Sequence, residues 1–164
     1  MKQLVIVRHA KSVPYGYDED FHRDLRKRGE SDSILVSGKL KKENYIPDLI
    51  ISSPALRAKR TAKIFADTFG YAPENIQIIE DLYEGVSTQE FIKMIKELPD
   101  ENNIVYVFGH NPTVFYLVNN LLEKFNDDMP TCSSVGIQFT IDLWKNVDVG
   151  KGTKAFHYIP KMFK

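Results

Sequence analysis

The chain has 164 residues, of which 43% are hydrophobic and 27% charged, a composition typical of a single folded domain with a substantial core. Its 22 Lys and Arg balance 22 Asp and Glu, and this zero formal net charge excludes bulk electrostatic binding to nucleic acid or to an anionic membrane, although not a local basic pocket. A single cysteine, Cys132, excludes an internal disulfide framework and a cysteine-rich zinc module.

The first part of the chain predicts a strand, a polar loop and a helix. The β-branched run at residues 4–7 is typical of a strand that is covered on both faces. Because this run ends at Arg8, it is too short for a signal-peptide core or a membrane span, and we expect a cytoplasmic protein. After an acidic loop with Pro14 and Gly16, residues 27–43 predict a helix. Its inner side is expected to comprise Ile34, Leu35, Gly38 and Leu40.

A second strand and helix follow. Residues 48–52 predict a short strand, Ser53 is expected to be the N-cap of the next helix, and Pro54 is expected to be its first residue. Gly70 is expected to end this helix. Its apolar face recurs at helical spacing in Ala55, Ala58, Ala62, Phe65 and Phe69.

The middle of the chain predicts strands at residues 76–79 and 104–108 with a helix between them. Ser87 and Glu90 form a capping-box pattern at the start of that helix. Its expected inner face comprises Phe91, Ile95 and Leu98. The Asn-Pro pair at residues 111–112 opens a further helix. The apolar stripe of this last helix comprises Val114, Leu117, Val118, Leu121, Leu122 and Phe125.

The last third predicts two strands, at residues 134–143 and 155–159, joined as a hairpin with Gly150 and Gly152 near its turn. Strands that alternate with helices favour a three-layer α/β/α sandwich around a mostly parallel sheet with an antiparallel edge. The sequence has no internal repeat, low-complexity tract or linker-like segment, so we expect residues 1–164 to form one domain.

Arginine and histidine side chains follow three of the predicted strands. Arg8 and His9 come directly after the first strand, Arg57 lies in the first turn of the helix after the second, and His110 follows the fourth. Parallel strands place their carboxyl ends at one edge of a sheet, where ligand crevices form and helix N-termini add N–H donors. We therefore expect these four side chains to converge within reach of one phosphate.

This set of side chains is suited to phosphoryl transfer. Arginine pairs bidentately with phosphate oxygens, and a neutral histidine can attack phosphorus through one ring nitrogen. A second histidine, when protonated, can donate a hydrogen bond to the transferring group. Because the sequence has no HxH, HExxH or Asp-rich companion, we expect no metal site and no cofactor, with these cations stabilising the transition state.

Other residues have simpler interpretations. His22 is interpreted as a loop residue and His157 as a strand residue, because neither has a companion motif. Cys132 is interpreted as a small buried residue and Trp144 as a packing residue.

The sequence resembles the histidine phosphatase superfamily in three motifs, which are RHAKS at residues 8–12, SSPALRAKRTA at 52–62 and GHNP at 109–112. It resembles the small SixA-like branch of phosphohistidine phosphatases in three further segments, which are DFHRDLRKRG at 20–29, MPTCSSVGIQF at 129–139 and the C-terminal IPKMFK. The matches run in the same order from residue 2 to residue 164. The resemblance implies a phosphoglycerate mutase-like fold.

The resemblance also implies a role for each matching residue. His9 would be the nucleophile that becomes phosphorylated, and Arg8, Arg57 and His110 would surround and neutralise the phosphoryl group. Enzymes of this family need no metal. Two further residues, Arg23 and Ser12, match positions that approach the phosphate or hold the first loop.

The resemblance places the proton donor in the loop after the third strand. Many members of the family have a glutamate or aspartate there, and we assign this role to Glu84, with Asp81 as the alternative. Asp24 stands where the branch usually has a proline, next to Arg23. Because imidazole needs less help from an acid to leave than an alkoxide does, a strong general acid is dispensable for cleaving phosphohistidine.

The sequence therefore predicts a metal-independent phosphohistidine phosphatase, whose partner is a phosphorylated protein side chain or a small phosphorylated molecule. The chain lacks room for the large insertion that bigger members use to enclose small substrates, which favours an open site. The alternatives are a broad small-molecule phosphatase of the same fold and a non-catalytic phosphoryl-binding module. A receiver-like domain is disfavoured because it needs acidic residues at the strand ends to hold Mg²⁺. The sequence does not predict the oligomeric state.

Overall fold

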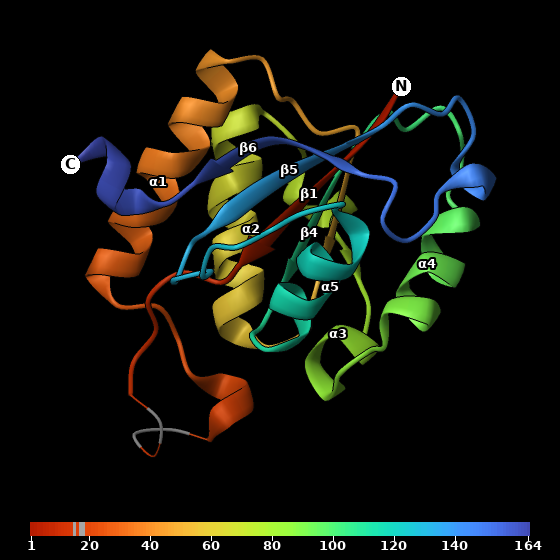
Figure 1. Ribbon diagram of the computed structural model, residues 1–164. Helices are drawn as coiled ribbons and strands as arrows, with labels where there is room; N and C mark the ends of the chain where they lie inside the picture. The colour runs from red at the N-terminus through yellow and green to blue at the C-terminus, as the bar shows by residue number, and fades with distance from the viewer. Residues whose placement is uncertain (15, 17–18) are drawn as a thin grey trace.

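A six-stranded mixed sheet forms the centre of the computed structural model, which describes residues 1–14, 16 and 19–164 (Figure 1). Within these residues the strand order is β3-β2-β4-β1-β5-β6. The strands are β1 (Lys2–Arg8), β2 (Leu49–Ser52), β3 (Gln77–Ile78), β4 (Ile104–Gly109), β5 (Ser134–Phe139) and β6 (Thr153–Tyr158). The first four strands in this spatial order are parallel, whereas β5 pairs antiparallel with both β1 and β6. The mostly parallel sheet with an antiparallel edge is confirmed.

Helices cover both faces of this sheet. The α-helices are α1 (Lys27–Lys42), α2 (Leu56–Phe69), α3 (Asp81–Glu84), α4 (Thr88–Lys96) and α5 (Thr113–Leu121). Short 3₁₀ helices are η1 (Asp20–His22), η2 (Pro73–Asn75), η3 (Trp144–Asn146) and η4 (Pro160–Phe163). Figure 1 shows α1 and α2 on one side of the sheet and α3, α4 and α5 on the other, which confirms the predicted three layers. Among the described residues, no helix has both the length and the apolar character needed to cross a membrane.

Strand β1 shows why the sheet is buried on both faces. Leu4 and Ile6 pack into the core under α4 and α5, whereas Val5 and Val7 pack into the core under α1 and α2. Successive side chains of a strand point to opposite faces, so a continuous apolar run supplies both cores at once.

Helix α1 presents a different face from the one predicted. Ile34 is 60% exposed, while the buried face includes Asp32, Ser33 and Ser37 beside Val36 and Leu40, so the assignment of Ile34 to the inner side is wrong. Two of these buried polar residues contact polar groups outside α1. The Ser37 hydroxyl donates to the Thr68 hydroxyl of α2 at 2.8 Å, and Lys164 Nζ lies 2.8 Å from a carboxylate oxygen of Asp32.

The start of α2 also differs from the prediction. The helix begins at Leu56 with Ala55 as its N-cap, so the assignment of Ser53 as N-cap and Pro54 as first helical residue is wrong. The Ser53 hydroxyl accepts a hydrogen bond from the Ala55 N–H at 3.2 Å and contacts His110. Ser53 therefore lies at the sheet edge, before the helix begins. The helix ends at Gly70 as predicted, with the glycine in the left-handed conformation at φ 75°.

The remaining elements follow the predicted order, with β3 and β5 shorter than predicted. The predicted cap of α4 is confirmed, since the Ser87 hydroxyl accepts the Glu90 N–H at 3.1 Å. The antiparallel hairpin of β5 and β6 is also confirmed, but β5 ends at Phe139 rather than at residue 143. The chain then turns into η3 around buried Trp144, whose indole N–H donates to the Asn102 carbonyl at 2.7 Å.

Candidate active site

The carboxyl ends of β1, β2 and β4 lie side by side at one edge of the sheet. Arg8 of β1 pairs with Gly109 of β4, and the His9 N–H donates to the Gly109 carbonyl at 3.0 Å. A pocket of about 360 Å³ opens at this edge. It is lined by Arg8, His9, Lys11, Ser12, Val13, Pro14, Arg23, Arg26, Arg57, His110, Asn111 and Thr131. The fold thus brings together the two arginines and two histidines that the sequence singles out, along with Ser12 and Arg23.

His9 is buried and oriented by its own backbone segment. Its Nδ1 lies 2.8 Å from the Ala10 carbonyl oxygen, and since a carbonyl only accepts, Nδ1 carries the proton and Nε2 carries the lone pair. The residue is 7% exposed. Burial, together with nearby His110, Arg57 and Arg8, lowers the pKa of His9 to about 3. At neutral pH His9 is therefore a neutral imidazole with an available nucleophilic nitrogen.

His110 lies beside His9, with ring centroids 5.2 Å apart. Its Nε2 is 2.8 Å from the Ser53 hydroxyl, which already accepts the Ala55 N–H and so has its own hydrogen free to donate to Nε2. With the Ser53 hydroxyl as the donor to Nε2, the imidazole proton of His110 lies on Nδ1. Burial and then Arg57 lower the pKa of His110 to about 4.

The two arginines are held at the sides of the pocket by backbone and carboxylate oxygens. Arg57, which is 5% exposed, donates from Nη1 to the Asp20 carbonyl at 2.7 Å and from Nη2 to the Asp20 carboxylate at 3.2 Å. Arg8 donates from Nη1 to the Met129 carbonyl at 3.1 Å.

Three buried donors of the site have no partner among the described residues. They are Nε of Arg8, Nε of Arg57 and Nδ1 of His110. An unpartnered buried N–H is costly, so such groups are expected to be satisfied by a bound acceptor. Arg8, Arg57 and His110 all line the phosphate pocket, so an anion with several oxygen acceptors is the ligand chemistry that suits these groups.

A residue that the sequence analysis missed links this site together. The Asp20 carboxylate accepts from Arg57, from Arg23 at 2.9 Å and from the Tyr83 hydroxyl at 2.8 Å. Although burial alone raises the pKa of Asp20, hydrogen bonds from Tyr83 and Arg57 and the Arg57 charge lower it below its usual range. Asp20 thus stays ionised. In the sequence its only signal was an acidic position three residues before Arg23.

The family model of branch 1 of the histidine phosphatase superfamily matches residues 4–101, which is more than half of the chain. The chain belongs to this superfamily. Two curated relatives are uncharacterized proteins. One, from Arabidopsis thaliana and chloroplastic, is 27% identical over 88% of this chain and 69% of its own. The other, from Mycobacterium leprae, is 23% identical over 94% of this chain and 100% of its own.

Solved structures share the fold of this histidine phosphatase. The protein histidine phosphatase SixA, in complex with tungstate, superposes with a TM-score of 0.84 at 23% identity over 99% of both chains. A mycobacterial glucosyl-3-phosphoglycerate phosphatase superposes with a TM-score of 0.66 at 15% identity, over 93% of this chain and all of that one. At these identities the likeness shows the phosphoglycerate mutase-like fold, as the motifs imply.

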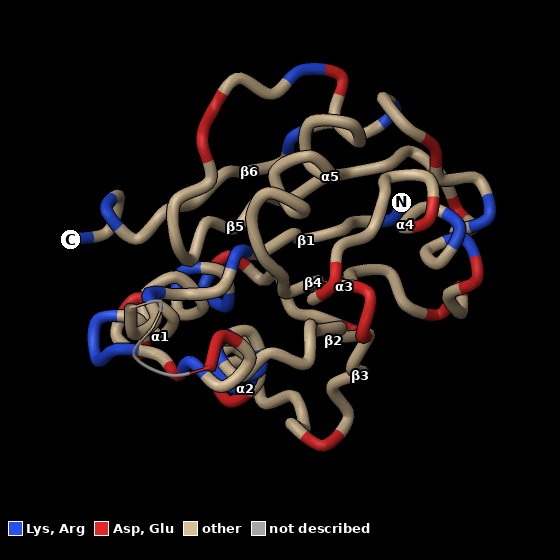
Figure 2. The backbone as a smooth tube through the Cα atoms, turned by 90° about the horizontal axis from the view of Figure 1, so that it is seen from below, with Lys and Arg blue, Asp and Glu red and all other residues tan. Residues whose placement is uncertain are grey.

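The remaining site residues of the histidine phosphatase add charge to the pocket. Arg23 donates from Nη1 to the Val13 carbonyl at 3.0 Å in addition to its contacts with Asp20, and Ser12 forms an isolated bridge with Leu25 that closes the first loop. Lys11 and Arg26, which the sequence analysis did not single out, also line the pocket. Figure 2 shows Lys and Arg positions gathered where α1, α2 and this loop meet.

Glu84 lies apart from these residues. It is exposed at the end of α3 and is not among the residues that line the pocket. Its neighbour Tyr83 is turned toward the site instead, with its ring centroid 5.7 Å from that of His110 and its hydroxyl on Asp20. The segment predicted as a loop after the third strand forms helix α3, and the side chain of this helix that contacts the site residues is Tyr83 rather than Glu84.

The other residues considered from sequence lie outside the pocket. His22 is exposed in η1, and His157 of β6 lies 3.4 Å from Asp127. Cys132 is buried, and burial raises the pKa of its thiol to about 12. Among the described residues, no cluster of three or more His, Cys, Asp or Glu side chains could hold a metal ion.

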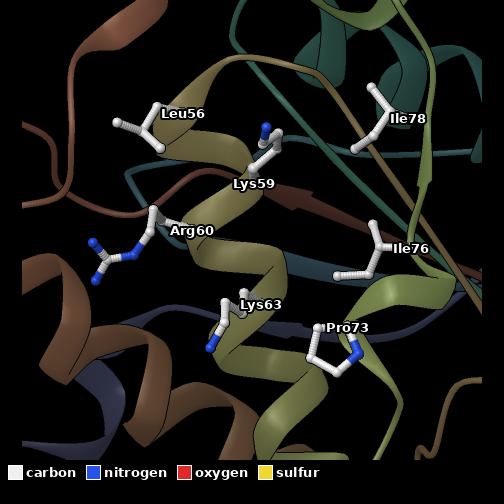
Figure 3. Close-up of a pocket in the computed structure, with 7 residues that line it drawn as sticks. All are labelled: Leu56, Lys59, Arg60, Lys63, Pro73, Ile76 and Ile78. Atoms are coloured by element: carbon white, nitrogen blue, oxygen red, sulfur yellow. The ribbon is translucent and has the colours of Figure 1, made fainter.

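A separate hollow of about 290 Å³ lies between α2 and the β3 edge (Figure 3). It is lined by Leu56, Lys59, Arg60, Lys63, Pro73, Ile76 and Ile78. None of the residues singled out for phosphate chemistry lies in it, and it shares no lining residue with the pocket at His9.

Proposed function

We propose that this histidine phosphatase hydrolyses phosphohistidine on protein substrates, without a metal, through a phosphoryl intermediate on His9. The observation that carries the proposal is the neutral imidazole of His9, whose Nδ1 is bonded to the Ala10 carbonyl, in a pocket shared with buried Arg57 and half-buried Arg8. Membership of the superfamily and the likeness to SixA, whose description names a protein histidine phosphatase, support it.

In the first step His9 Nε2 attacks the phosphorus of the substrate. The Nε2–P bond forms, the P–N bond of phosphohistidine breaks, and the departing imidazole nitrogen takes a proton from water. In the second step the hydroxide left by this water attacks phosphorus, the Nε2–P bond breaks with its electron pair returning to His9, and inorganic phosphate forms. Arg8 and Arg57 supply positive charge to the phosphoryl oxygens in both steps, and Arg8, Arg57 and the Nδ1–H of neutral His110 supply hydrogen bonds.

The leaving group explains why the pocket can work without a strong acid. Asp20, the carboxylate that pairs with Arg57 and Arg23, is held ionised and so cannot donate a proton at neutral pH. Imidazole departs with a basic nitrogen that water can protonate, whereas an alkoxide needs a positioned acid. We therefore expect phosphoramidates to be better substrates than alkyl phosphates. The only substrates for which Glu84 could act as a proton donor are the alkyl phosphates.

An open pocket suits a phosphorylated side chain carried by a protein. The site opens at the sheet edge, and its lining set comes from the first loop, β1, α2 and the residues after β4 and before β5. The alternative substrate is a small phosphoester. The fold that this chain shares with a glucosyl-3-phosphoglycerate phosphatase supports this alternative.

The test compares substrates on the purified protein. We expect hydrolysis of a phosphohistidine peptide that is insensitive to EDTA, that disappears in His9→Ala, and that exceeds hydrolysis of an alkyl phosphate by at least about tenfold in kcat/KM. Phosphate binding without turnover would show a phosphoryl-binding module instead. Faster turnover of an alkyl phosphate than of phosphohistidine would show a small-molecule phosphatase.

A further inference from the structure

A groove larger than the phosphate pocket adjoins it. Its volume is about 610 Å³, and Arg8 and Asn111 line both cavities. The other residues of the groove are Pro112, Phe115, Asp128, Met129 and Pro130. Because the two cavities share a wall, a molecule whose phosphoryl group binds at His9 can continue into the groove along the protein surface.

The shared wall is held together by one carbonyl oxygen. The Met129 carbonyl accepts a hydrogen bond from Arg8 Nη1 at 3.1 Å and another from Asn111 Nδ2 at 3.0 Å. Met129 itself is buried, and Phe115 packs with its ring centroid 6.4 Å from that of Phe125. The groove is therefore built before any ligand arrives, and its wall is tied to an arginine of the phosphate pocket.

The chemistry of the groove differs from that of the pocket. Pro112, Phe115 and Pro130 make its surface apolar, and Asp128 places an exposed carboxylate among them. An apolar wall favours an apolar group, and a carboxylate favours a cation over an anion. A free phosphate gains nothing from such a surface. The volume of the groove falls in the range of ~300–1,000 Å³ that is typical of ligand-binding pockets.

We propose that this groove binds the residues that flank a phosphohistidine in a protein substrate, with an apolar side chain against Phe115 and a basic side chain near Asp128. The inference rests on the proposed function and adds to it a sequence preference around the phosphorylated residue. The hollow of Figure 3 is a poorer candidate for the flanking residues, because it shares no lining residue with the phosphate pocket.

The test uses four synthetic phosphohistidine peptides that differ only at the two residues after the histidine, which are Leu-Lys, Leu-Glu, Ser-Lys and Ser-Glu. We expect the wild-type protein to have a kcat/KM about tenfold higher for the leucine peptides than for the serine peptides, which is the discrimination typical of an apolar contact. We also expect its kcat/KM to be higher for the lysine peptides than for the glutamate peptides. Phe115→Ala is expected to remove most of the leucine preference. Asp128→Lys is expected to reverse the lysine preference.

Ratios between peptides make the result independent of how much of each variant is folded. Tyr116→Ala is the matched control, because this aromatic side chain follows Phe115 on α5, is 58% exposed and does not line the groove. Ile78→Ala is the control for the other hollow. Both controls are expected to keep the wild-type ratios.

Three results would overturn the inference, and they are distinguishable. Hydrolysis of all four peptides at equal rates, or ratios that survive both groove substitutions, contradicts the groove while leaving the proposed function intact. No hydrolysis of any peptide or of phosphoramidate itself contradicts the proposed function and the inference together. A Phe115-dependent preference for phenyl phosphate over every peptide would assign the groove to small aryl phosphates instead.

Discussion

His9 combines two features that a phosphoryl acceptor needs. Burial keeps the imidazole neutral, and the hydrogen bond from Nδ1 to the Ala10 carbonyl leaves the lone pair on Nε2. Arg57 and Arg8 contribute to the low pKa of His9, so the same cations that attract a phosphoryl group keep its acceptor unprotonated. This double effect of the arginines follows from the packing of the site, and it could not be predicted from the sequence motif alone.

The depressed pKa of His9 predicts a dependence of stability on pH. An unfolded histidine has a pKa of ~6.5, whereas folded His9 has a pKa of about 3, so between these values the unfolded chain binds more protons. The free energy of unfolding is therefore expected to fall as the pH is lowered from 7 to 4.5. His9→Gln should reduce that fall by on the order of 2 kcal/mol.

Urea unfolding followed by circular dichroism at several pH values measures this effect. His22→Gln is the matched control, because its side chain is exposed. A His9→Gln variant with the same pH slope as the wild-type protein would show that His9 is not held neutral by burial.

A substitution of Glu84 tests whether hydrolysis of phosphohistidine needs a strong acid. Because Glu84 is exposed and does not line the pocket, Glu84→Gln is expected to change kcat/KM for a phosphohistidine peptide by less than about twofold. Parallel assays with an alkyl phosphate complete the measurement. Equal and large losses on both substrates would make Glu84 the general acid and contradict the account.

At the scale of elements, the first loop, α2 and α3 meet at one carboxylate. Asp20 of η1 joins Arg57 of α2, Arg23 of the loop and Tyr83 of α3. The three segments lie far apart in sequence, so the position of Arg57 depends on a contact that local patterns do not encode. Asp20 acts on this site through the arginines as a positioning residue.

Asp20→Asn is expected to lower the free energy of unfolding by about 1–2 kcal/mol, because it leaves buried Arg57 without a charged partner. It should also lower kcat/KM on phosphohistidine by loosening the arginines. Asp24→Asn is the matched control, since its pair with Arg60 is more exposed and should cost less than about 1 kcal/mol. Equal costs for the two variants, measured by urea unfolding, would contradict the linking role of Asp20.

Elements with strong periodic signals were predicted well, and those that depend on tertiary contacts were not. The β-branched run of β1 and the Ser87 cap of α4 are local signals that the structure confirms. The inner face of α1 was misassigned because Ser37 is buried against Thr68 of α2 and Asp32 is buried in an ion pair with Lys164. Their partners are distant in sequence.

At the scale of the whole molecule, zero net charge coexists with a strongly basic pocket. Arg8, Arg23, Arg26, Arg57 and Lys11 all line it, and Asp20 pairs with two of these arginines. The other acidic residues that the structure describes do not line the pocket. Topology explains how the sequence could indicate this site, because parallel strands bring their carboxyl ends to one edge. The sequence could not indicate the contacts of Asp20 and Tyr83 or the adjoining apolar groove, because these form only between segments that are distant in sequence.

The central claim is that phosphate passes through Nε2 of His9. The direct measurement is a rapid quench at alkaline pH during turnover of a phosphohistidine peptide, followed by ³¹P NMR and mass spectrometry of the enzyme. The account predicts phosphate on His9, attached to Nε2 because Nδ1 is bonded to the Ala10 carbonyl, and no labelled enzyme in His9→Ala. Phosphate on Nδ1, on another residue, or on no residue during active turnover would contradict it.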